Sequence, residues 1–431
     1  MKTYEKYKPS GVEWIGDIPE HWEVKKLKFT SEINSSTLPE KFKRDFEIKY
    51  IDISSVNSNG EITQTTDHWF SEAPSRARRI VQVGDTIIST VRTYLKAIAF
   101  IESEFENLIC STGFAVVRPN DCYFDKFLFY LCYSDFFIQR VVSLSKGVSY
   151  PAIDSEDIKN IFVWIPPLEE QTAIADYLDE KTAEIDELIA KKERLIELLK
   201  EERTAIINQA VTRGINPNVK LKPSGIDWLG DIPEHWEVKK LKFIADIFGG
   251  STPSTSNEEF WDGEITWITP ADVSKVKGNY IFDSQRKITK EGLKSCATKL
   301  LDEGTIILTT RAPIGNLVLA GVKFSTNQGC KSLVIKSGIP NFYFYQIGQL
   351  KEVLQAFGTG TTFKELSTDS LKNFLLNVPP IEEQKEIVEF IESKTNEIDS
   401  TIAKIEKEIE LVKEYRTALI SEVVTGKIKV C

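Results

Sequence analysis

The sequence lacks the residue groupings that usually hold a metal ion or build a disulfide framework. No two of its cysteines form a C-x-x-C pair, and their positions do not correspond between the two repeated halves of the chain. We therefore expect reduced thiols, several of them in cores, and neither a zinc site nor a disulfide framework. The six cysteines are Cys110, Cys122, Cys132, Cys296, Cys330 and Cys431.

Long apolar runs are missing as well. No run approaches the roughly 18 apolar residues that a membrane-spanning helix needs, and the first residues, MKTYEKYKPSG, lack the apolar segment of a signal peptide. We expect a cytoplasmic protein that does not contact a membrane. With 431 residues, 41% of them hydrophobic and 27% charged, the composition is typical of a soluble globular protein with two or more domains.

Signatures of catalysis are also scarce. The chain has no G-x-x-x-x-G-K-[ST] phosphate loop and no Gly-rich cofactor loop. Asn377 stands near two prolines, as in the methyltransferase tetrapeptide, but Val378 separates it from them and no aromatic residue follows. The D-x-K spacing of nucleases occurs at Asp157, yet Ser370 holds the equivalent place in the second half. We predict that the chain catalyses nothing by itself.

What the chain does contain is an internal duplication. KPSGVEWIGDIPEHWEVKKLKF at Lys8–Phe29 recurs as KPSGIDWLGDIPEHWEVKKLKF at Lys222–Phe243, with 19 of 22 positions identical. A second repeat follows each copy, beginning PPLEEQ at Pro166 and PPIEEQ at Pro379. The residues between the two markers differ strongly. A constant frame with variable contents predicts two different recognition surfaces held in fixed geometry.

Several aromatic and histidine residues lie inside this repeated frame. His21 and His235 supply two of the three histidines of the chain, and each precedes a tryptophan. We expect both histidines to pack within the frame and not to act in catalysis or metal binding. The tryptophans that we assign to cores and interfaces are Trp14, Trp22, Trp228 and Trp236.

The formal net charge of −10 argues at first against a nucleic-acid partner. Phosphate contacts require only a local basic face, however, and the negative charge is unevenly spread. Much of it lies in two Glu-rich segments, Glu169–Glu202 and Glu382–Glu414. The intervening regions therefore remain free to carry a basic surface.

The Glu-rich segments are the clearest helices in the sequence. Apolar residues recur in them mostly at spacings of three and four, and no glycine interrupts before Gly214 and Gly426. We predict two coiled-coil helices of about 45 residues, each roughly 65 Å long, that cover each other's apolar seam. The predicted seam residues are Leu178, Ile185, Leu188, Leu195, Leu199, Ile206, Ile391, Ile398, Ile402, Ile405, Ile409, Val412 and Leu419.

The remaining segments predict a mixed, α+β fold class. Short β-branched runs bounded by Gly, Pro or Asn predict strands, and short helices precede the last strand of each half at Asp125–Val142 and Asn341–Phe357. We expect domains at residues 1–165 and 216–378, followed by long helices at 166–215 and 379–431. The predicted strands are Phe46–Ile53, Thr86–Thr90, Phe114–Val117, Ile161–Ile165, Ile265–Ile268, Thr305–Thr309, Lys331–Ile335 and Phe374–Val378.

The order of these segments resembles the specificity (S) subunit of Type I restriction-modification systems. The frame PSGxxWxGxIPxHWEVxxLK, a variable domain, then PPLEEQ with a long helix, and the same series again, cover essentially the whole chain. The resemblance implies two target-recognition domains joined by a pair of long antiparallel coiled-coil helices with pseudo-two-fold symmetry. Each domain would then read one half of a bipartite site in double-stranded DNA.

The resemblance also implies partners. Two modification subunits would bring S-adenosylmethionine and methylate adenine, and restriction subunits would translocate and cleave DNA. Cofactors, including Mg and ATP, are then expected on the partner subunits and none in this chain. Thr182–Ile185, with its counterpart Thr395–Ile398, resembles the unit that sets the spacing of the two half-sites in some family members.

The length of the predicted helices fits this role. Antiparallel helices related by a two-fold axis hold their domains at opposite ends, whereas a parallel pair holds them side by side. Successive turns of B-DNA lie about 34 to 36 Å apart, so such a rod suits two readers one to two turns apart. Because the variable domains differ, we expect an asymmetric target with a fixed gap of unspecified bases.

Candidate DNA contacts are basic, amide and hydroxyl residues on loops. Arg92 and Arg311 each follow a Gly-led strand, and Gly147 and Gly360 hold equivalent places before the last strand of their halves. The equivalence of these loops supports their grouping. The candidates are Arg76, Arg78, Arg79, Arg92, Thr93, Tyr94, Lys96, Lys146, Ser149 and Tyr150 in the first half, and Ser251, Thr252, Arg286, Lys287, Thr310, Arg311, Gln328, Thr361, Thr362 and Lys364 in the second.

Two other functions remain open from the sequence. A coiled-coil scaffold or adaptor with two protein-binding domains would be consistent with the acidic net charge. Salt-dependent binding to a particular DNA duplex would argue against this function. A self-contained methyltransferase is disfavoured because its cofactor motifs are missing.

Overall fold

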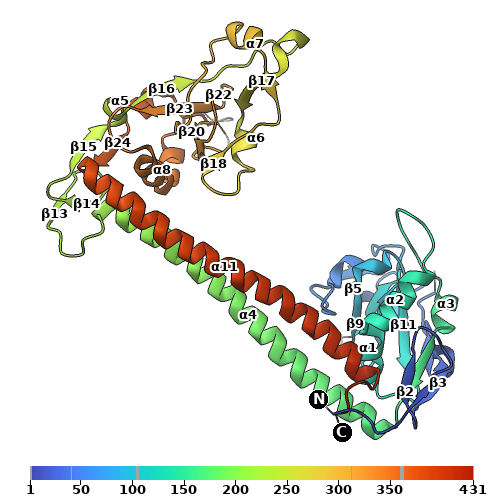
Figure 1. Ribbon diagram of the computed structural model, residues 1–431. Coiled ribbons are helices and arrows are strands. Elements are labelled where there is room, and N and C mark those ends of the chain that lie inside the picture. Colours follow the sequence, from blue (N-terminus) through green and yellow to red (C-terminus); the bar gives the residue numbers. More distant parts are fainter. Residues whose placement is uncertain (1, 40, 103–105, 312, 360–363, 431) are drawn as a thin grey trace. The chain divides into compact units, whose positions relative to one another are not determined.

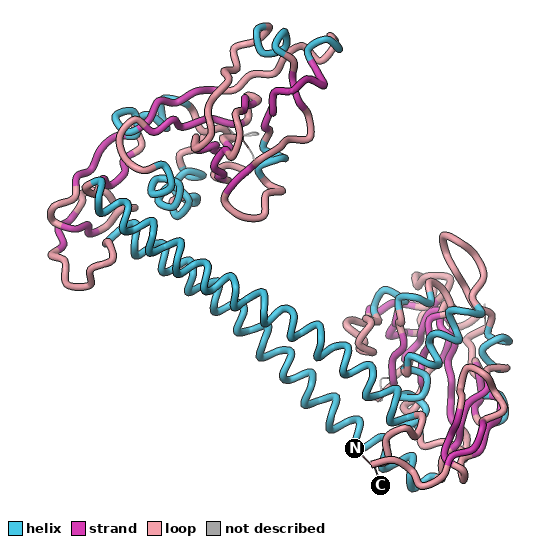
Figure 2. The backbone as a smooth tube through the Cα atoms, in the orientation of Figure 1, coloured by secondary structure: helices cyan, strands magenta, loops and turns pink. Residues whose placement is uncertain are grey.

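The computed structural model describes residues 2–39, 41–102, 106–311, 313–359 and 364–430. The chain forms two compact units, the first built from two segments of the sequence and the second from one. Unit 1 comprises Met1–Glu193 with Glu406–Cys431, and unit 2 comprises Arg194–Ile405. Each unit contains a mixed domain of short strands and helices, together with portions of two long helices (Figure 2). The mixed α/β class predicted from the sequence is confirmed.

The mixed domain of unit 1 is built on two four-stranded sheets, with strand orders β6-β5-β10-β7 and β4-β11-β8-β9. Strand β8 is buried along its whole length, and Ile87, Phe114 and Val116 meet in the core between strands. The strands are β1 (Tyr7–Pro9), β2 (Asp17–Pro19), β3 (Glu23–Lys26), β4 (Ser31–Ile33), β5 (Glu47–Ile51), β6 (Thr66–Trp69), β7 (Ala77–Ile80), β8 (Thr86–Ser89), β9 (Ile98–Phe100), β10 (Leu108–Ser111), β11 (Phe114–Pro119) and β12 (Phe162–Ile165).

Unit 2 repeats this plan with a five-stranded sheet, β16-β23-β20-β21-β18, and a three-stranded sheet, β19-β17-β22. All eight strands predicted from the sequence are present in the two units, with ends shifted by a few residues. The strands of unit 2 are β13 (Leu221–Pro223), β14 (Asp231–Pro233), β15 (Glu237–Lys240), β16 (Ala245–Gly249), β17 (Trp261–Ile268), β18 (Tyr280–Ile281), β19 (Lys287–Ile288), β20 (Ile306–Thr309), β21 (Leu317–Ala320), β22 (Phe324–Thr326), β23 (Cys330–Ile335) and β24 (Leu375–Val378).

The two short helices predicted before the last strands are each broken into two. In unit 1 the break falls at Ser134, which is extended and whose hydroxyl accepts a hydrogen bond from the amide of Phe137, so that a new helix begins there. In unit 2 it falls at Leu350. The short helices are α1 (Asp125–Tyr133), α2 (Asp135–Leu144), α3 (Ser155–Lys159), α5 (Leu241–Ile244), α6 (Pro270–Val273), α7 (Lys290–Lys294), α8 (Pro340–Gln349), α9 (Lys351–Ala356) and α10 (Thr368–Lys372).

Short 3-10 turns complete the described elements: η1 (Leu27–Phe29), η2 (Ile53–Ser55), η3 (Thr93–Leu95) and η4 (Glu258–Phe260). Across the described residues, no single helix has the length and apolar character of a membrane span. Helices α1 and α2 pass that test only as a pair, by length and composition, and are bent by 61° at their junction.

The long helices are α4 (Leu168–Arg213) and α11 (Ile381–Val424). In unit 1 the first turns of α4 lie beside the last turns of α11, and in unit 2 the last turns of α4 lie beside the first turns of α11 (Figure 1). The helices therefore run antiparallel within each unit, as predicted. Each helix contributes apolar side chains to the core of both units, such as Leu178 and Leu419 in unit 1 and Ile207 and Ile391 in unit 2.

The predicted seam is correct along α11 but wrong at two positions of α4. Ile398, Ile402, Ile405 and Ile409 are all buried, and Val412 is partly buried. On α4, by contrast, Leu188 and Leu195 are 43% and 45% exposed.

The residues that follow these two leucines on α4 are less exposed: Ile189 is partly buried and Ile196 is buried. The heptad that starts at Leu178 and Ile185 continues through Lys192 and Leu199. The sequence alone does not fix this register, because a polar residue, Lys192, occupies a seam position. At 188–189 and 195–196, in addition, two adjacent apolar residues each fit a spacing of three or four.

Ion pairs join the two helices in both units. In unit 1 Arg416 Nε donates to Asp186 Oδ1 at 3.0 Å, and in unit 2 Arg203 Nε donates to Asp399 Oδ1 at 3.1 Å. Each arginine stands 213 positions from the other and so does each aspartate, so the two pairs are equivalent under the duplication. The interhelical contact thus keeps the internal symmetry of the sequence.

The repeated histidine–tryptophan pair is hydrogen-bonded to a glutamate in the first turn of a long helix. In unit 1 Trp22 Nε1 donates to Glu170 Oε2 at 3.0 Å and His21 Nε2 lies 2.5 Å from Glu170 Oε1. Unit 2 repeats the arrangement at Glu383, which accepts from Trp236 Nε1 at 3.0 Å. Trp22 and Trp236 are fully buried, which confirms their predicted place in cores.

Each mixed domain also holds the end of the long helix that begins in the other half of the sequence. Trp164 Nε1 on β12 donates to the carbonyl oxygen of Val424 in unit 1. Asn377 Nδ2 on β24 donates to the carbonyl oxygen of Val211 at 2.8 Å in unit 2. Since the last carbonyls of a helix have no partner within it, these bonds cap α11 and α4. Both helices therefore support each mixed domain.

Candidate nucleic-acid interface

In unit 1 two loops distant in sequence meet at one end of the β8 sheet. The segment 90–96 follows β8, and the segment 145–152 follows α2. Arg92 N donates to the carbonyl of Pro151 at 2.7 Å, and Ile153 N donates to the carbonyl of Thr90 at 2.9 Å. The guanidinium of Arg92 lies 4.7 Å from the ring centre of Tyr150. The loops predicted as DNA-contacting in this half thus form one surface.

Unit 2 contains the same pair of loops, held by the same backbone bonds. Thr310 N donates to Gly329 O at 2.8 Å, just as Thr90 N donates to Gly113 O at 2.8 Å in unit 1. Leu366 N donates to Thr310 O at 2.9 Å, the counterpart of the bond from Ile153. The backbone bonds at the bases of the loops are therefore equivalent in the two units, whereas Gly360, which the predicted equivalence also used, lies outside the described residues.

The equivalence differs by one residue from the correspondence of Arg92 with Arg311 that the sequence suggested. Val91 forms a bridge with Ala152 in unit 1, and Arg311 forms the matching bridge with Glu365 in unit 2. Arg311 is therefore equivalent to Val91 and not to Arg92. Its Nε lies 3.1 Å from Glu365 Oε2, so the side chain is held in an ion pair at the mouth of the loop.

Three further segments extend the unit 1 surface: residues 34–38, residues 76–78 and residues 112–113. Leu38 N donates to the carbonyl oxygen of Arg78 at 2.8 Å, and Thr112 N donates to that of Arg76 at 2.8 Å. Because Gly113 bonds in turn to Thr90, the surface is continuous from β7 to the paired loops. Arg76 on it is exposed.

The cations of unit 1 are held in different ways. The guanidinium of Arg78 stacks 4.7 Å above the ring of Phe70. Arg79 is partly buried, its Nε has no hydrogen-bond partner among the described residues, and burial lowers its pKa. Lys96 pairs with Asp135 at 3.2 Å and Lys146 with Asp157 at 3.8 Å.

In unit 2 aromatic residues organise the loop after β16. Trp267 Nε1 donates to Ser251 O and Trp261 Nε1 to Ser254 O, both at 3.1 Å. The Arg286 guanidinium stacks 3.6 Å above Trp261. These contacts hold residues 251–254 beside an exposed cation, an arrangement suited to phosphate or base contacts.

Gln328 is exposed beside the same loop. Its Oε1 accepts a hydrogen bond of 2.5 Å from the hydroxyl of Thr252. An amide held in this way presents its remaining donors and acceptor outward, which is the grouping that reads adenine or other base edges. Lys287 pairs with Asp283 at 3.1 Å nearby in sequence, and Lys364 is exposed.

Two candidates lie where they cannot touch DNA. Thr93 is 5% exposed, with its hydroxyl 2.8 Å from that of Ser145, and Thr310 is fully buried, with its hydroxyl bonded to Gly329 O. Their proposal as contact residues is wrong, because both hydroxyls are engaged in holding the loops. Thr361 and Thr362 lie outside the described residues.

The structure brings forward residues that the sequence did not single out. Ser35 and Thr37 are exposed on the loop equivalent to Ser251 and Thr252. Lys299 is the counterpart of Arg79, because each residue stands the same number of positions before the glycine that precedes β20 or β8, Gly304 and Gly84 respectively. Aligning the two halves through the glycine before β8 and β20 would have found it.

Lys331 lies under the Arg311–Glu365 pair in unit 2 and is only 8% exposed. Its burial lowers its pKa, while the carboxylate of Glu365 acts to raise the pKa and Arg311 to lower it further. This lysine therefore supplies charge to the underside of the paired loops and is shielded from solvent.

The cysteines stand apart from this surface. The five described cysteines are free thiols, and Cys110, Cys132 and Cys330 are buried, as predicted for core residues. Burial raises the pKa of Cys330 to about 12 and raises the pKa of the other two as well. Within the described ranges, no group of three or more His, Cys, Asp or Glu side chains is placed to hold a metal ion.

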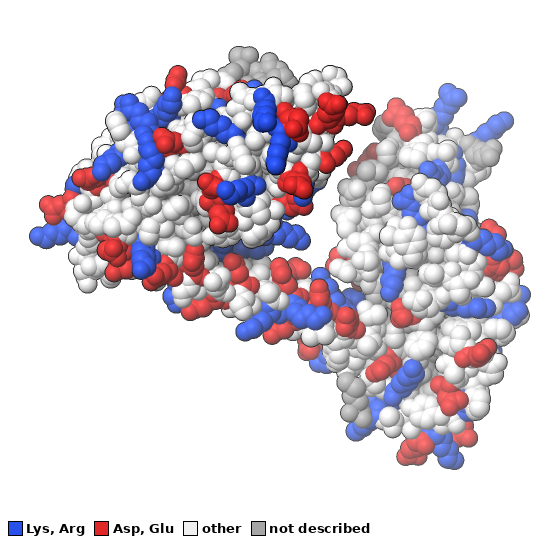
Figure 3. All heavy atoms as spheres, turned by 45° about the horizontal axis from the view of Figure 1, so that its top comes forward, with Lys and Arg blue, Asp and Glu red and all other residues white. Residues whose placement is uncertain are grey.

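Charged side chains of both signs lie on the surface of the molecule. On the face seen in Figure 3, Lys and Arg are interspersed with Asp and Glu on the mixed domain of unit 2, as they are along the long helices.

Comparison with known proteins agrees with this arrangement. The family described as Type I restriction modification DNA specificity domain matches residues 19–198 and again residues 233–411. The chain belongs to this family. Membership favours DNA specificity over the coiled-coil adaptor that the acidic composition left open, and the fold and repeated site are those of a Type I restriction-modification specificity subunit.

Individual relatives support the assignment along the chain. The putative Type I restriction enzyme MjaX specificity subunit of Methanocaldococcus jannaschii is 27% identical over 96% of this chain and 96% of its own length. The MjaIX specificity subunit of the same organism is 41% identical over 37% of this chain, a match that spans 38% of that protein.

A solved structure shares the fold. The chain described under "Structural basis underlying complex assembly and conformational transition of the type I R-M system" has a TM-score of 0.77 at 24% identity. It covers 95% of this chain and 99% of that one. The likeness therefore extends over both units.

Proposed function

We propose that the chain reads an asymmetric, bipartite site in double-stranded DNA, one half-site with each mixed domain. The observation that carries this proposal is the repeated pair of loops. Their backbone bonds at Thr90 and Thr310 are the same, but the side chains they display differ: Arg92 stacks on Tyr150 in unit 1, and Arg311 pairs with Glu365 in unit 2. The same frame with different donors suits two different base sequences.

We further propose that the chain acts together with two modification subunits and with restriction subunits. The exposed apolar residues of the long helices support this. Leu188, Leu411 and Tyr415 in unit 1 are between 43% and 51% exposed, and Leu195 and Leu198 in unit 2 are each 45% exposed. Apolar side chains on an otherwise Glu- and Lys-rich helix suit docking of partner helices.

The chain supplies recognition and not chemistry in this proposal. Its sequence has no cofactor loop or phosphate loop. S-adenosylmethionine, Mg and ATP are therefore assigned to the partner subunits, and the isolated chain is expected to bind DNA weakly because its net charge is −10.

Mapping of methylated adenines tests the proposal. The chain is expressed with its modification subunits in cells that lack other adenine methyltransferases, and the genome is sequenced for modified bases. The expected result is one asymmetric motif with two specified parts and an unspecified gap. A continuous or palindromic motif would contradict the bipartite reading, and no methylation despite an assembled complex would contradict DNA specificity itself.

A chimaera tests which half reads which part. Replacing residues 44–165 with the matching region of another specificity subunit is expected to change one half-site and to leave the gap and the other half-site intact. A change in both half-sites would show that the domains do not read independently.

A further inference from the structure

The tip of the 146–150 loop in unit 1 exposes apolar and aromatic side chains to an unusual degree. Val148 is fully exposed at 100%, and Tyr150 is 66% exposed. The adjoining loop adds Tyr94 and Leu95, at 52% and 49%. Side chains of this kind normally lose solvent contact on folding, so their grouping at one tip marks a surface that another molecule covers.

This tip is rigidly presented. Lys146 and Ala152 exchange two backbone hydrogen bonds, of 2.8 and 2.9 Å, at the base of the loop. Gly147 has a φ of +105°, and Arg92 and Lys96 both adopt the left-handed conformation that residues with a Cβ rarely take. A residue with a Cβ keeps such a backbone conformation only where the surrounding contacts hold it there, and such residues cluster at functional sites.

The charges around the tip favour nucleic acid over protein as the molecule that covers it. Arg92 stacks on Tyr150, and the ammonium of Lys146, with its side chain 81% exposed, stands at the loop base. The nearest acidic partners are Asp157, 3.8 Å from Lys146, and Asp135, 3.2 Å from Lys96. An apolar tip with cations at its base matches stacked bases between two phosphate backbones.

We propose that Val148 and Tyr150 form a wedge that enters the duplex at the unit 1 half-site and unstacks one base step. The cations at its base contact the flanking phosphates, and the stacked Arg92 keeps the Tyr150 ring oriented. Opening a base step costs stacking energy, and the apolar contacts of the wedge replace it. The inference rests on the proposed DNA recognition and adds a deformation of the duplex to it.

The test uses the chain assembled with its modification subunits and duplexes that carry the mapped target. The base analogue 2-aminopurine, whose fluorescence rises when it unstacks, replaces a base at successive steps of the unit 1 half-site. A several-fold rise is expected at one step. Val148→Ser and Tyr150→Ala should abolish this rise and weaken specific binding by about tenfold.

Matched controls keep the outcome interpretable. Val83→Ser and Phe29→Ala remove exposed apolar side chains, at 46% and 62%, that precede β8 and β4 and so lie away from the paired loops. They should leave the fluorescence and the affinity unchanged. The wedge variants should also keep the salt dependence of binding, whereas Arg92→Gln should lower its slope, because of the three substituted side chains only the arginine carries a charge that can contact a phosphate.

Three results would overturn the wedge. The first is no rise in fluorescence at any step of the half-site in the wild-type complex. The second is a rise that the wedge variants keep. The third is failure of the wedge variants to assemble with the modification subunits, which would make the tip a protein-docking surface. In each of these cases the wild-type complex still binds its mapped target, so the proposed function stands. Failure of the wild-type complex to bind that target would overturn both.

Discussion

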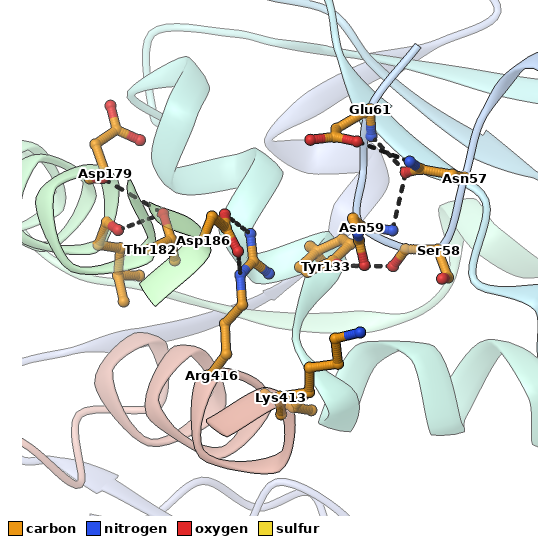
Figure 4. A network of polar contacts seen from close by, with 12 residues as sticks. Asn57, Ser58, Asn59, Glu61, Tyr133, Asp179, Thr182, Asp186, Lys413 and Arg416 are labelled. Atoms are coloured by element: carbon orange, nitrogen blue, oxygen red, sulfur yellow. Dashed lines mark hydrogen bonds and ion pairs between the residues drawn. The ribbon is translucent and has the colours of Figure 1, made fainter. Parts of the chain in front are cut away.

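Arg416 of α11 grips the carboxylate of Asp186 on α4 through two hydrogen bonds, of 3.0 and 3.1 Å (Figure 4). The Arg416 side chain is only 16% exposed. Burial acts to lower its pKa, but the hydrogen bond to Asp186 and the nearby Tyr133 raise it, and the net pKa is raised. The guanidinium also lies 5.8 Å from the ring centre of Tyr133, whose hydroxyl bonds to Ser58 O of the mixed domain.

Removing Asp186 should therefore cost more stability than removing its symmetry mate, Asp399. Asp186→Ala leaves the shielded Arg416 unpaired, and we expect a loss of about 1–2 kcal/mol. Asp399→Ala leaves Arg203, whose side chain is 31% exposed, and should cost less than about 1 kcal/mol. Urea unfolding followed by helical circular dichroism measures both. Equal losses would contradict the role assigned to burial.

Glu170 gives a pH-dependent contribution to stability. Burial acts to raise the pKa of this carboxyl, but hydrogen bonds from Trp22, His21 and Tyr4 outweigh burial, and the pKa falls below its ordinary value of 4.5. The folded protein then binds fewer protons than the unfolded chain around and below pH 4.5. The stabilisation is complete above pH 4.5 and is lost as the pH falls through the lowered pKa.

Glu170→Gln should accordingly lower the melting temperature at pH 7 more than at pH 3.5. The exposed neighbour Glu169, changed to Gln, serves as the matched control and should lower it at neither pH. Thermal unfolding across this pH range measures the difference. A Glu170→Gln effect that stays constant with pH would show that the hydrogen bonds do not depend on the ionised carboxylate.

Gln328 should specify a base, and Lys287 should not. Gln328→Ala in the assembled complex should relax the methylated motif at one position of the unit 2 half-site, at a cost of about 1–3 kcal/mol in discrimination. Lys287→Gln should weaken binding evenly across sequences and lower the salt slope, since its ammonium offers only charge. Methylation mapping and binding titrations separate the two. An unchanged motif in Gln328→Ala would remove this residue from base reading.

An insertion in α4 tests whether helix length sets the gap between half-sites. Four residues inserted after Ile185 add roughly 6 Å and keep the seam nearly in register, so the methylated gap should grow by one or two base pairs. Two residues rotate the seam by about 200° and should impair assembly instead. Methylation of the original spacing at full efficiency by the four-residue variant would refute the role of the helix.

Much of the fold was predictable because the strongest signals are local. Each predicted strand is a β-branched run between turn residues, and each long helix repeats its apolar residues over many turns. The break at Ser134 was not recognised, since one capping hydroxyl decides it within a continuous apolar stretch. Leu188 and Leu195 were misassigned because Lys192 and Arg203, held in interhelical ion pairs, occupy seam positions.

The candidate site was predictable as a set of loops but not residue by residue. Equivalent places in the two halves identified the segments, yet whether Thr93 or Thr310 points inward depends on tertiary hydrogen bonds to Ser145 and Gly329. Lys299 escaped notice because the sequence around it does not resemble the segment with Arg79. Its place follows from the equal spacing of Lys299 and Arg79 from Gly304 and Gly84.

The bonds from Trp164 and Asn377 to helix ends carry a consequence for how such proteins diversify. The indole of Trp164 donates to the main-chain carbonyl of Val424, and the carboxamide of Asn377 donates to that of Val211. Two chemically different side chains thus make the same kind of bond. A main-chain acceptor is present whatever side chain the helix carries there. A mixed domain with any side-chain donor at this position can therefore hold a helix end, and the sequence of that helix end can change without loss of the bond.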